Sequence, residues 1–132
     1  MLARADADAL CASMEDAWNA GDGAGWAASF AEDADFVNVL GQHARGRAAI
    51  GAGHQEIFDG IYRGSRNRMA VEDLRALDDR ISLMHVSATL DVPGGPMAGT
   101  HRALMSIVVD GSGSKPLIVA LHNTMLRERP GV

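Results

Sequence analysis

The sequence of 132 residues has little of several features that would identify a function directly. It contains one cysteine, Cys11, which excludes an internal disulfide and a cysteine-rich zinc site. No apolar run approaches the roughly 20 residues of a membrane-spanning helix. Acidic residues among the first eight positions do not fit a signal peptide. We therefore expect a soluble cytoplasmic protein with no membrane partner.

Basic residues are also scarce, with 12 Lys and Arg against 17 Asp and Glu and a net charge of −5. Nucleic-acid binding uses a clustered positive surface, and the chain has no basic run, so we expect no nucleic-acid partner. The chain has neither a GxGxxG motif after a strand nor a P-loop. Its five histidines form no HxH or HxxxH pair. We therefore expect no cofactor and no metal.

The apolar residues that are present follow helix and strand periods. Spacings of three and four residues predict amphipathic helices over 3–20, 23–31 and 47–62. Runs of strand formers, separated by turns rich in Gly, Pro and Asp, predict strands over 35–40, 65–77, 80–92, 98–110 and from 117 onward. The order ααβαββββ predicts a single α+β domain over residues 1–132. Three helices would pack on a mostly antiparallel sheet.

The last predicted strand carries the clearest irregularity. It is apolar on both sides from Leu117 to Leu121, which is typical of a central strand, and then meets His122, Asn123 and Thr124. A buried polar group without a partner costs roughly 1–3 kcal/mol, so we expect a cavity or polar partners at this end. Side chains alternate between the two faces of a strand, so only one of His122 and Asn123 can point inward. We favour His122.

Other polar side chains also interrupt apolar patterns. His54 lies on the apolar face of the third helix, Asn38 lies within the first strand, and His85 lies within the strand over 80–92. Each is either satisfied within the core or faces a pocket. We predict that His54, Asn38 and either His122 or Asn123 converge in one cavity. A histidine there, His54 or His122, with a pKa near 6–7 could move a proton to or from a bound carbonyl compound.

The remaining candidates are weaker. Trp18 and Phe58 are predicted to be buried between helices and sheet, and they could form a pocket wall. Asp35 is the nearest carboxylate to serve as a base, although the acidic series around it resembles a solvated connection. Gly51 and Gly53 weaken the third helix, and either permit a close backbone approach or have no role.

Four segments carry a family resemblance: 17–22 (AWNAGD), 30–41 (FAEDADFVNVLG), 46–50 (GRAAI) and 120–124 (ALHNT). They resemble the SgcJ/EcaC group of SnoaL-like proteins in the nuclear transport factor 2-like superfamily, over nearly the whole chain. The resemblance implies a cone-shaped, cystatin-like fold. In this fold a strongly bent sheet wraps the long helix and leaves a pocket at the wide end. It also implies a homodimer through the outer sheet face.

Two functions remain open, because this superfamily includes isomerases, dehydratases, polyketide cyclases and non-catalytic members. The chain either binds a small apolar carbonyl compound, with or without acid/base chemistry of these types, or is a non-catalytic dimeric binding or assembly module. No clear buried Asp or Glu lies mid-strand, so enzyme activity stays uncertain. Apolar residues on both faces of the strand over 98–110, including Leu104 and Val108, predict a homodimer through the sheet.

Overall fold

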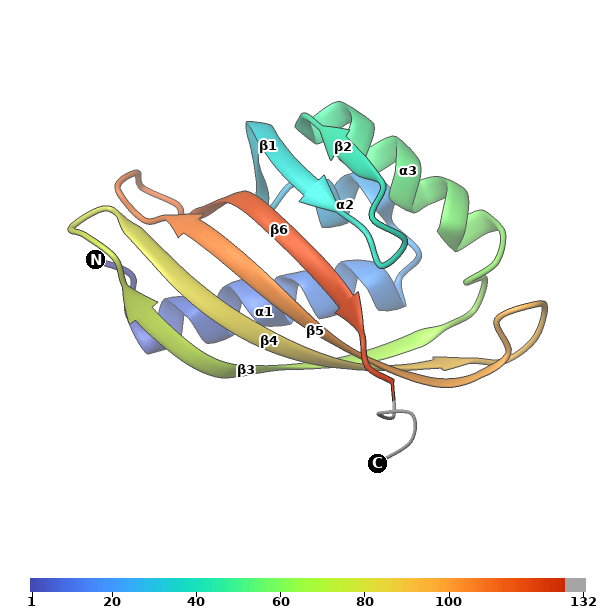
Figure 1. The fold of residues 1–132 in the computed structure, drawn as a ribbon. Helices are drawn as coiled ribbons and strands as arrows, with labels where there is room; N and C mark the ends of the chain where they lie inside the picture. The colour runs from blue at the N-terminus through green and yellow to red at the C-terminus, as the bar shows by residue number, and fades with distance from the viewer. Residues whose placement is uncertain (128–132) are drawn as a thin grey trace.

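The computed structural model describes residues 1–127 as three helices packed on one curved six-stranded sheet (Figure 1). The helices are α1 (Arg4–Asn19), α2 (Gly23–Ala27) and α3 (Arg47–Asp59). The strands are β1 (Phe30–Val37), β2 (His43–Arg45), β3 (Arg66–Ala76), β4 (Ile81–Val92), β5 (Gly99–Asp110) and β6 (Leu117–Met125). Their order is β2-β1-β6-β5-β4-β3, and only the β1–β6 pair is parallel. The predicted α+β architecture is confirmed. None of the described helices is long and apolar enough to cross a membrane.

The first strand differs from the prediction. It begins at Phe30 rather than at Asp35, and the residues between the predicted strand over 35–40 and the predicted helix over 47–62 contain the short strand β2. The hairpin between them is closed by Asn38, whose Oδ1 accepts hydrogen bonds from the backbone N–H groups of Leu40 and Gln42 at 3.0 and 2.9 Å. Such side-chain bonds within a turn are a common use of Asn, and here they allow three further residues to pair with β1.

A β-bulge shapes the central strand β6. A register shift between Val108 and Val109 of β5 leaves Val119 of β6 as an extra residue. As a result Ile118 and Leu121, three positions apart, both face the core and are at most 2% exposed. For the rest of the strand, the bulge exchanges the residues that face the core with those that face outward.

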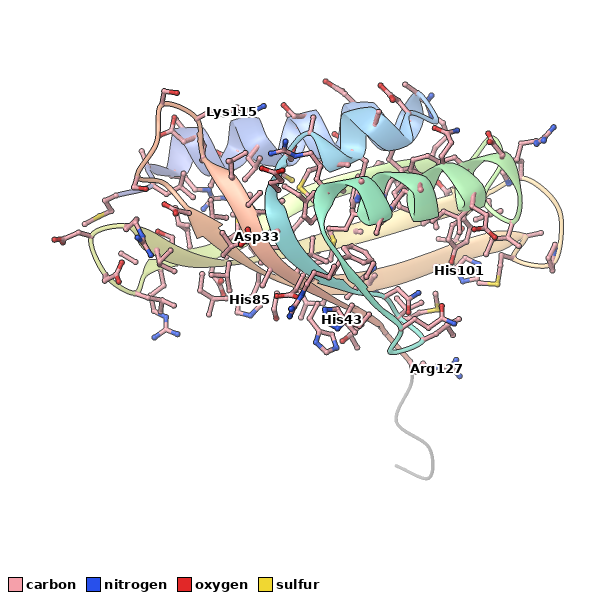
Figure 2. All side chains as sticks on the ribbon, turned by 90° about the horizontal axis from the view of Figure 1, so that it is seen from above. Asp33, His43, His85, His101, Lys115 and Arg127 are labelled. Carbon is pink, nitrogen blue, oxygen red and sulfur yellow. The ribbon has the colours of Figure 1, made fainter. Side chains whose placement is uncertain are left out.

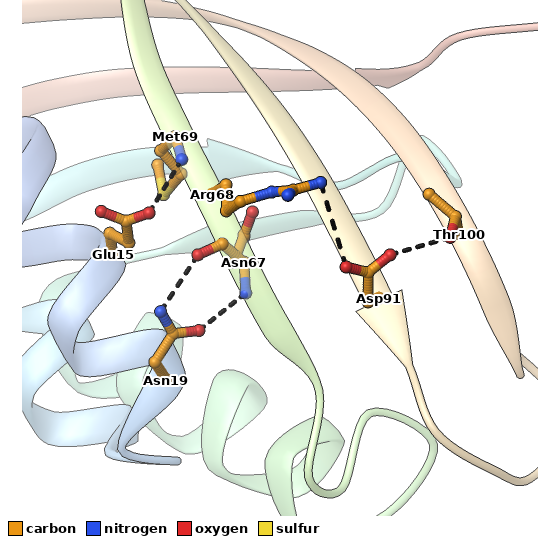
Figure 3. A network of polar contacts seen from close by, with 7 residues as sticks. All are labelled: Glu15, Asn19, Asn67, Arg68, Met69, Asp91 and Thr100. Atoms are coloured by element: carbon orange, nitrogen blue, oxygen red, sulfur yellow. Dashed lines mark hydrogen bonds and ion pairs between the residues drawn. The ribbon is translucent and has the colours of Figure 1, made fainter.

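Helix α1 crosses the concave face of the sheet and covers the edge strand β3 (Figures 1 and 3). The Asn19 side chain accepts from Asn67 N at 2.7 Å and donates to Asn67 O at 3.0 Å. Glu15 accepts from the backbone N–H of Met69 at 3.2 Å, and Arg4 donates to a carbonyl further along the strand. These bonds occupy backbone groups that would otherwise be available for pairing with another chain. They also fix the backbone of Asn67.

The two shorter helices meet through glycines. A Cβ placed on Gly23 would lie 2.6 Å from the carbonyl oxygen of Gly51, so α2 and α3 can approach this closely only without a side chain at residue 23. At Gly51 a Cβ would lie 3.2 Å from the Cβ of Ala27, whereas a Cβ on Gly53 would meet nothing within 4 Å. The close backbone approach is therefore made at Gly51 and not at Gly53.

Candidate functional site

A cavity of about 420 Å³ lies between α3 and the inner face of the sheet. Its floor includes Ala88 and Ala103, which pair with each other on β4 and β5. Four residues further along the same two strands the inward side chains are Met84 and Ile107, both fully buried. The change from large to small side chains leaves space beneath α3, whose residues Ile50, His54 and Ile57 form the facing wall.

Aromatic rings form much of the remaining wall. Trp18, Trp26, Phe36 and Tyr62 all line the cavity. Trp26 stacks on the imidazole of His54 with ring centroids 4.9 Å apart, and Phe36 meets the same imidazole edge-on at 4.7 Å. Such a wall favours a flat, largely apolar ligand.

His54 is held neutral within this wall. Its Nδ1 lies 2.8 Å from the carbonyl oxygen of Ile50, one turn earlier in α3, so Nδ1 carries the proton and Nε2 is left as an acceptor. Burial lowers the pKa of His54 to about 4, although the bond to Ile50 acts in the opposite direction. The predicted pKa near 6–7 is therefore wrong for His54, because the ring is 6% exposed and faces no charge that would offset its desolvation.

Three buried polar atoms of the described residues have no hydrogen-bond partner: Nε1 of Trp26, Oδ1 of Asn67 and Oδ1 of Asn123. All three residues line the cavity. Trp26 is 2% exposed and Asn67 is 5% exposed. An unpaired buried donor or acceptor costs roughly 1–3 kcal/mol, and folded proteins contain few of them. Three in the lining of one cavity mark a surface suited to receive polar groups of a ligand.

The structure brings together part of the predicted site. Trp18, His54, Asn38 and Asn123 line the same cavity. The Asn38 side chain, however, is engaged in the β1–β2 turn, where its Nδ2 also donates to Gln42 at 2.9 Å. Asn38 therefore supports the cavity rim, and its amide is already satisfied.

The preference for His122 as the inward residue is wrong. Because alternation is reset at the bulge, Leu121 faces the core, His122 faces outward and is exposed, and Asn123 faces the cavity. His85 is also on the outer face of the sheet, where its Nδ1 lies 2.8 Å from a carboxylate oxygen of Asp73 (Figure 2). Its predicted place in the pocket is therefore wrong too.

Two other predicted residues lie away from the cavity. Phe58 is buried, as predicted, but it packs behind the wall against Trp18, with ring centroids 4.8 Å apart. Asp35 is on the outer face, 2.7 Å from Nε2 of His43 and 3.0 Å from Nε of Arg45. The hydrogen bonds from these two side chains lower the pKa of Asp35. A base in the cavity cannot come from this carboxylate.

Sequence reasoning missed Asn67 and His101. Asn67 lies two residues before Met69 on the inward side of β3, so strict alternation would have marked it as an inward amide. His101, which the sequence did not single out, also lines the cavity, with its Nε2 2.7 Å from the carbonyl oxygen of Met97. The Ala88–Ala103 pair, which makes the space, becomes visible only when the strand register is known.

No three His, Cys, Asp or Glu side chains among residues 1–127 are grouped so that they could hold a metal ion. Among the described residues that line the cavity, Glu56 carries the one carboxylate, and this side chain is exposed. The cavity is therefore chemically an apolar, aromatic space with isolated neutral hydrogen-bonding groups.

The chain matches the SnoaL-like domain family over residues 11–111. A domain of unknown function with a cystatin-like fold from Nostoc punctiforme PCC 73102 is 34% identical, with a TM-score of 0.83 over 96% of this chain and 81% of that one. An uncharacterized cystatin-like protein from Caulobacter vibrioides is 22% identical, with a TM-score of 0.82 over 93% and 89%. A ketosteroid isomerase-like protein from Erwinia carotovora atroseptica SCRI1043 is 9% identical, with a TM-score of 0.77 over 94% and 96%. The last two likenesses show the fold alone. No curated protein matches significantly.

Proposed function

Because the chain belongs to the SnoaL-like domain family, which includes isomerases and ligand-binding proteins, we propose that it binds an uncharged, largely apolar small molecule in its cavity. The observation that carries this proposal is the set of three unpartnered polar atoms on the wall, at Trp26, Asn67 and Asn123. The volume of about 420 Å³ lies within the roughly 300–1,000 Å³ of small-molecule pockets.

The ligand is uncharged because no charged group lies in the buried part of the described lining to neutralise an ion, and the carboxylate of Glu56 is exposed to solvent. No Lys or Arg is among the described residues that line it, and His54 is neutral at pH 7. A buried ion without a partner of opposite charge is strongly unfavourable. A carboxylate or phosphate ligand is therefore disfavoured.

The ligand also carries a hydrogen-bond acceptor, such as a carbonyl oxygen. The indole N–H of Trp26 can only donate, and it is unpartnered within the aromatic wall. A carbonyl group on a flat ring system would accept this bond while its rings lie against Trp18 and Phe36.

Binding is supported better than catalysis. A general base acts best when its pKa is near the working pH, and the pKa of His54 is about 4. His122, the other candidate, lies on the opposite face of the sheet. Acid/base catalysis by His54 and membership of the SgcJ/EcaC group stay predictions.

The cavity can be tested by filling it. Gly53 lines the cavity, and a Cβ there meets nothing within 4 Å, so Gly53→Trp should fill the space without disturbing α3. Gly53→Ala is the matched control, because it adds only a methyl group. We expect wild type and Gly53→Ala to bind benzophenone, an uncharged aromatic ketone, as followed by tryptophan fluorescence and calorimetry. Gly53→Trp should bind at least tenfold more weakly. No binding to wild type, or equal binding to all three, would contradict the proposal.

We also propose that the chain forms a single domain that dimerises through the outer face of the sheet. Buried residues from α1, α2, α3 and the long strands join one core. Leu104 is 37% exposed on the outer face, and Leu83 and Val108 pair with each other two outward-facing positions further along the same strands. Light scattering should give about twice the 13.9 kDa of the chain, and Val108→Asp should halve that mass. A wild-type monomer at micromolar concentration would overturn the dimer.

A further inference from the structure

We infer that the ligand carries a hydroxyl group at each of its two ends, one bound by Asn67 and the other by Asn123. The inference rests on the proposed function and specifies the class of ligand: a flat apolar molecule with two terminal alcohol or phenol groups. It is carried by the positions of the two unpartnered amides and by the small side chains that separate them.

The register places the amides at opposite corners of the cavity floor. Asn123 of β6 pairs with Met105, and Met105 pairs through β4 with Val71 of β3. Asn67 lies four residues before Val71 on that strand. On a flat sheet, Asn67 and Asn123 would therefore be separated by three strand spacings across the strands and by four residues along them. Each of these separations corresponds to roughly 14 Å. The curvature of the sheet shortens the distance between the inward side chains, but it leaves them at two separate ends.

The floor between the two amides is low and apolar. Ala88 and Ala103 occupy its middle, flanked by Leu90 and Met105, and all four line the cavity. Since alanine has no side chain beyond Cβ, the space above this pair is open to the rings of a ligand. On this floor the polar groups of that ligand would meet a partner only at the ends.

A hydroxyl is the group that suits both amides. Each amide presents an acceptor and a donor side by side, and a hydroxyl both donates and accepts, so it is satisfied with either orientation of the amide. A ketone or ether cannot donate to the unpartnered Oδ1 atoms of Asn67 and Asn123. A carboxylate cannot donate either, and it would bring a charge that no described lining residue neutralises.

Asn67 is also held rigidly for this role. Both its backbone N–H and its carbonyl are bonded to the side-chain amide of Asn19 (Figure 3), so the strand cannot shift to give its own side chain a protein partner. A fixed, unsatisfied amide is prepared for a ligand group before binding, which reduces the entropy lost on association.

The test compares biphenyl, biphenyl-4-ol and 4,4′-dihydroxybiphenyl, which share one ring system and differ in the number of terminal hydroxyls. Tryptophan fluorescence titration of the full chain should show that each hydroxyl raises the affinity about tenfold. This is the effect of roughly two hydrogen bonds per hydroxyl, one donated to the amide and one accepted from it. Asn67→Leu and Asn123→Leu should each remove one of these two increments and leave the affinity for biphenyl unchanged or higher. His122→Leu, one residue from Asn123 but on the outer face, is the control and should retain both increments.

The outcomes separate this inference from the proposed function. If the diol binds no tighter than biphenyl, or if the Leu variants keep both increments, the hydroxyl assignment is overturned and uncharged binding stands. If 4,4′-biphenyldicarboxylate binds tightest, both proposals are overturned. If neither benzophenone nor any of the biphenyls binds, the proposed function is overturned and the inference with it.

Discussion

The inner face of one sheet is built in two different ways along its length. At the end near the β3–β4 and β5–β6 turns, which we call the packed end, Met84, Ile107 and Ile118 are fully buried in the hydrophobic core. At the other end, which we call the open end, the same strands carry Ala88 and Ala103 and leave a cavity. Along β4 and β5 the two ends are continuous in backbone and register, so the difference between Met84–Ile107 and Ala88–Ala103 is one of side-chain volume.

The two ends also differ in their buried polar groups. The three buried atoms without partners, at Trp26, Asn67 and Asn123, belong to residues that line the cavity of the open end. Local rules of packing and hydrogen bonding are usually broken where function requires it. We infer that the packed end supplies stability and that the open end gives up part of it for binding.

The largest effect is expected for a phenylalanine at the packed end. Phe30 is fully buried beside Ile118, and Phe30→Ala should lower the free energy of unfolding by about 3–5 kcal/mol. Phe36 is 7% exposed and lines the cavity, so the same change there removes contacts on one side only and should cost less, about 2 kcal/mol. Urea unfolding of the two variants measures the difference. Equal losses of unfolding free energy in the two variants would contradict the difference in packing between the two ends.

The next effect is a pH dependence that arises at the open end. The pKa of His54 is about 4 in the folded chain against 6.5 as its ordinary value, so the unfolded chain binds the proton more readily. Its contribution is fully present above pH 6.5 and is lost as the pH falls toward 4, by about 3 kcal/mol. The aspartates with lowered pKa values, including Asp35 and Asp73, lose their contribution as the pH falls through and below 3.8, a loss that begins at about pH 5. The part of the profile between pH 6.5 and about pH 5 therefore reports mainly on His54.

The measurement is urea unfolding at intervals between pH 7 and pH 4. His54→Phe should flatten the profile between pH 6.5 and about pH 5, whereas His122→Gln, on the exposed face, should leave it unchanged. A wild-type stability that stays constant from pH 6.5 to pH 4 would show that His54 is accessible enough to titrate normally.

A smaller effect of opposite sign is expected for the unpartnered amides. Asn123→Leu replaces a buried amide that has no partner for its Oδ1 with an apolar side chain of similar size, so it should raise the free energy of unfolding by about 1–3 kcal/mol without ligand. Thermal unfolding would show this as a higher Tm. Asn38→Leu is the control, because the Asn38 side chain is bonded within its turn and its loss should destabilise the chain. A lower Tm for Asn123→Leu would mean that the amide is satisfied after all.

The sequence predicted the fold well because the fold depends on regular patterns. The helix containing Trp18 and the strands flanking the turns at 78–79 and 111–114 follow directly from period and breaker residues. The resemblance of four short segments supplied the family. The short strand β2 was missed because three residues cannot display a period, and its pairing depends on the turn formed by Asn38.

The site was predicted only in part, because it depends on register and volume. His54 could be placed on the cavity from the helix period alone. The choice between His122 and Asn123 required knowledge of the bulge at Val119, which reverses which residues face inward and which no local pattern indicates. The pKa of His54 required the depth of its burial between Trp26 and Phe36.

The smallest expected effect compares two glycines of α3 that the sequence could not distinguish. Gly53 faces the open cavity, so Gly53→Ala should stabilise the chain by about 1 kcal/mol through helix propensity alone. At Gly51 the same methyl group would press on Ala27 at 3.2 Å and on the Gly23 carbonyl oxygen at 3.4 Å, which offsets this gain or reverses it. Differential scanning calorimetry should therefore show a higher Tm for Gly53→Ala and an unchanged or lower Tm for Gly51→Ala. Equal gains at both positions would mean that α2 can move away from α3. In that case α3, which forms the wall of the cavity facing the sheet, would not be fixed in position.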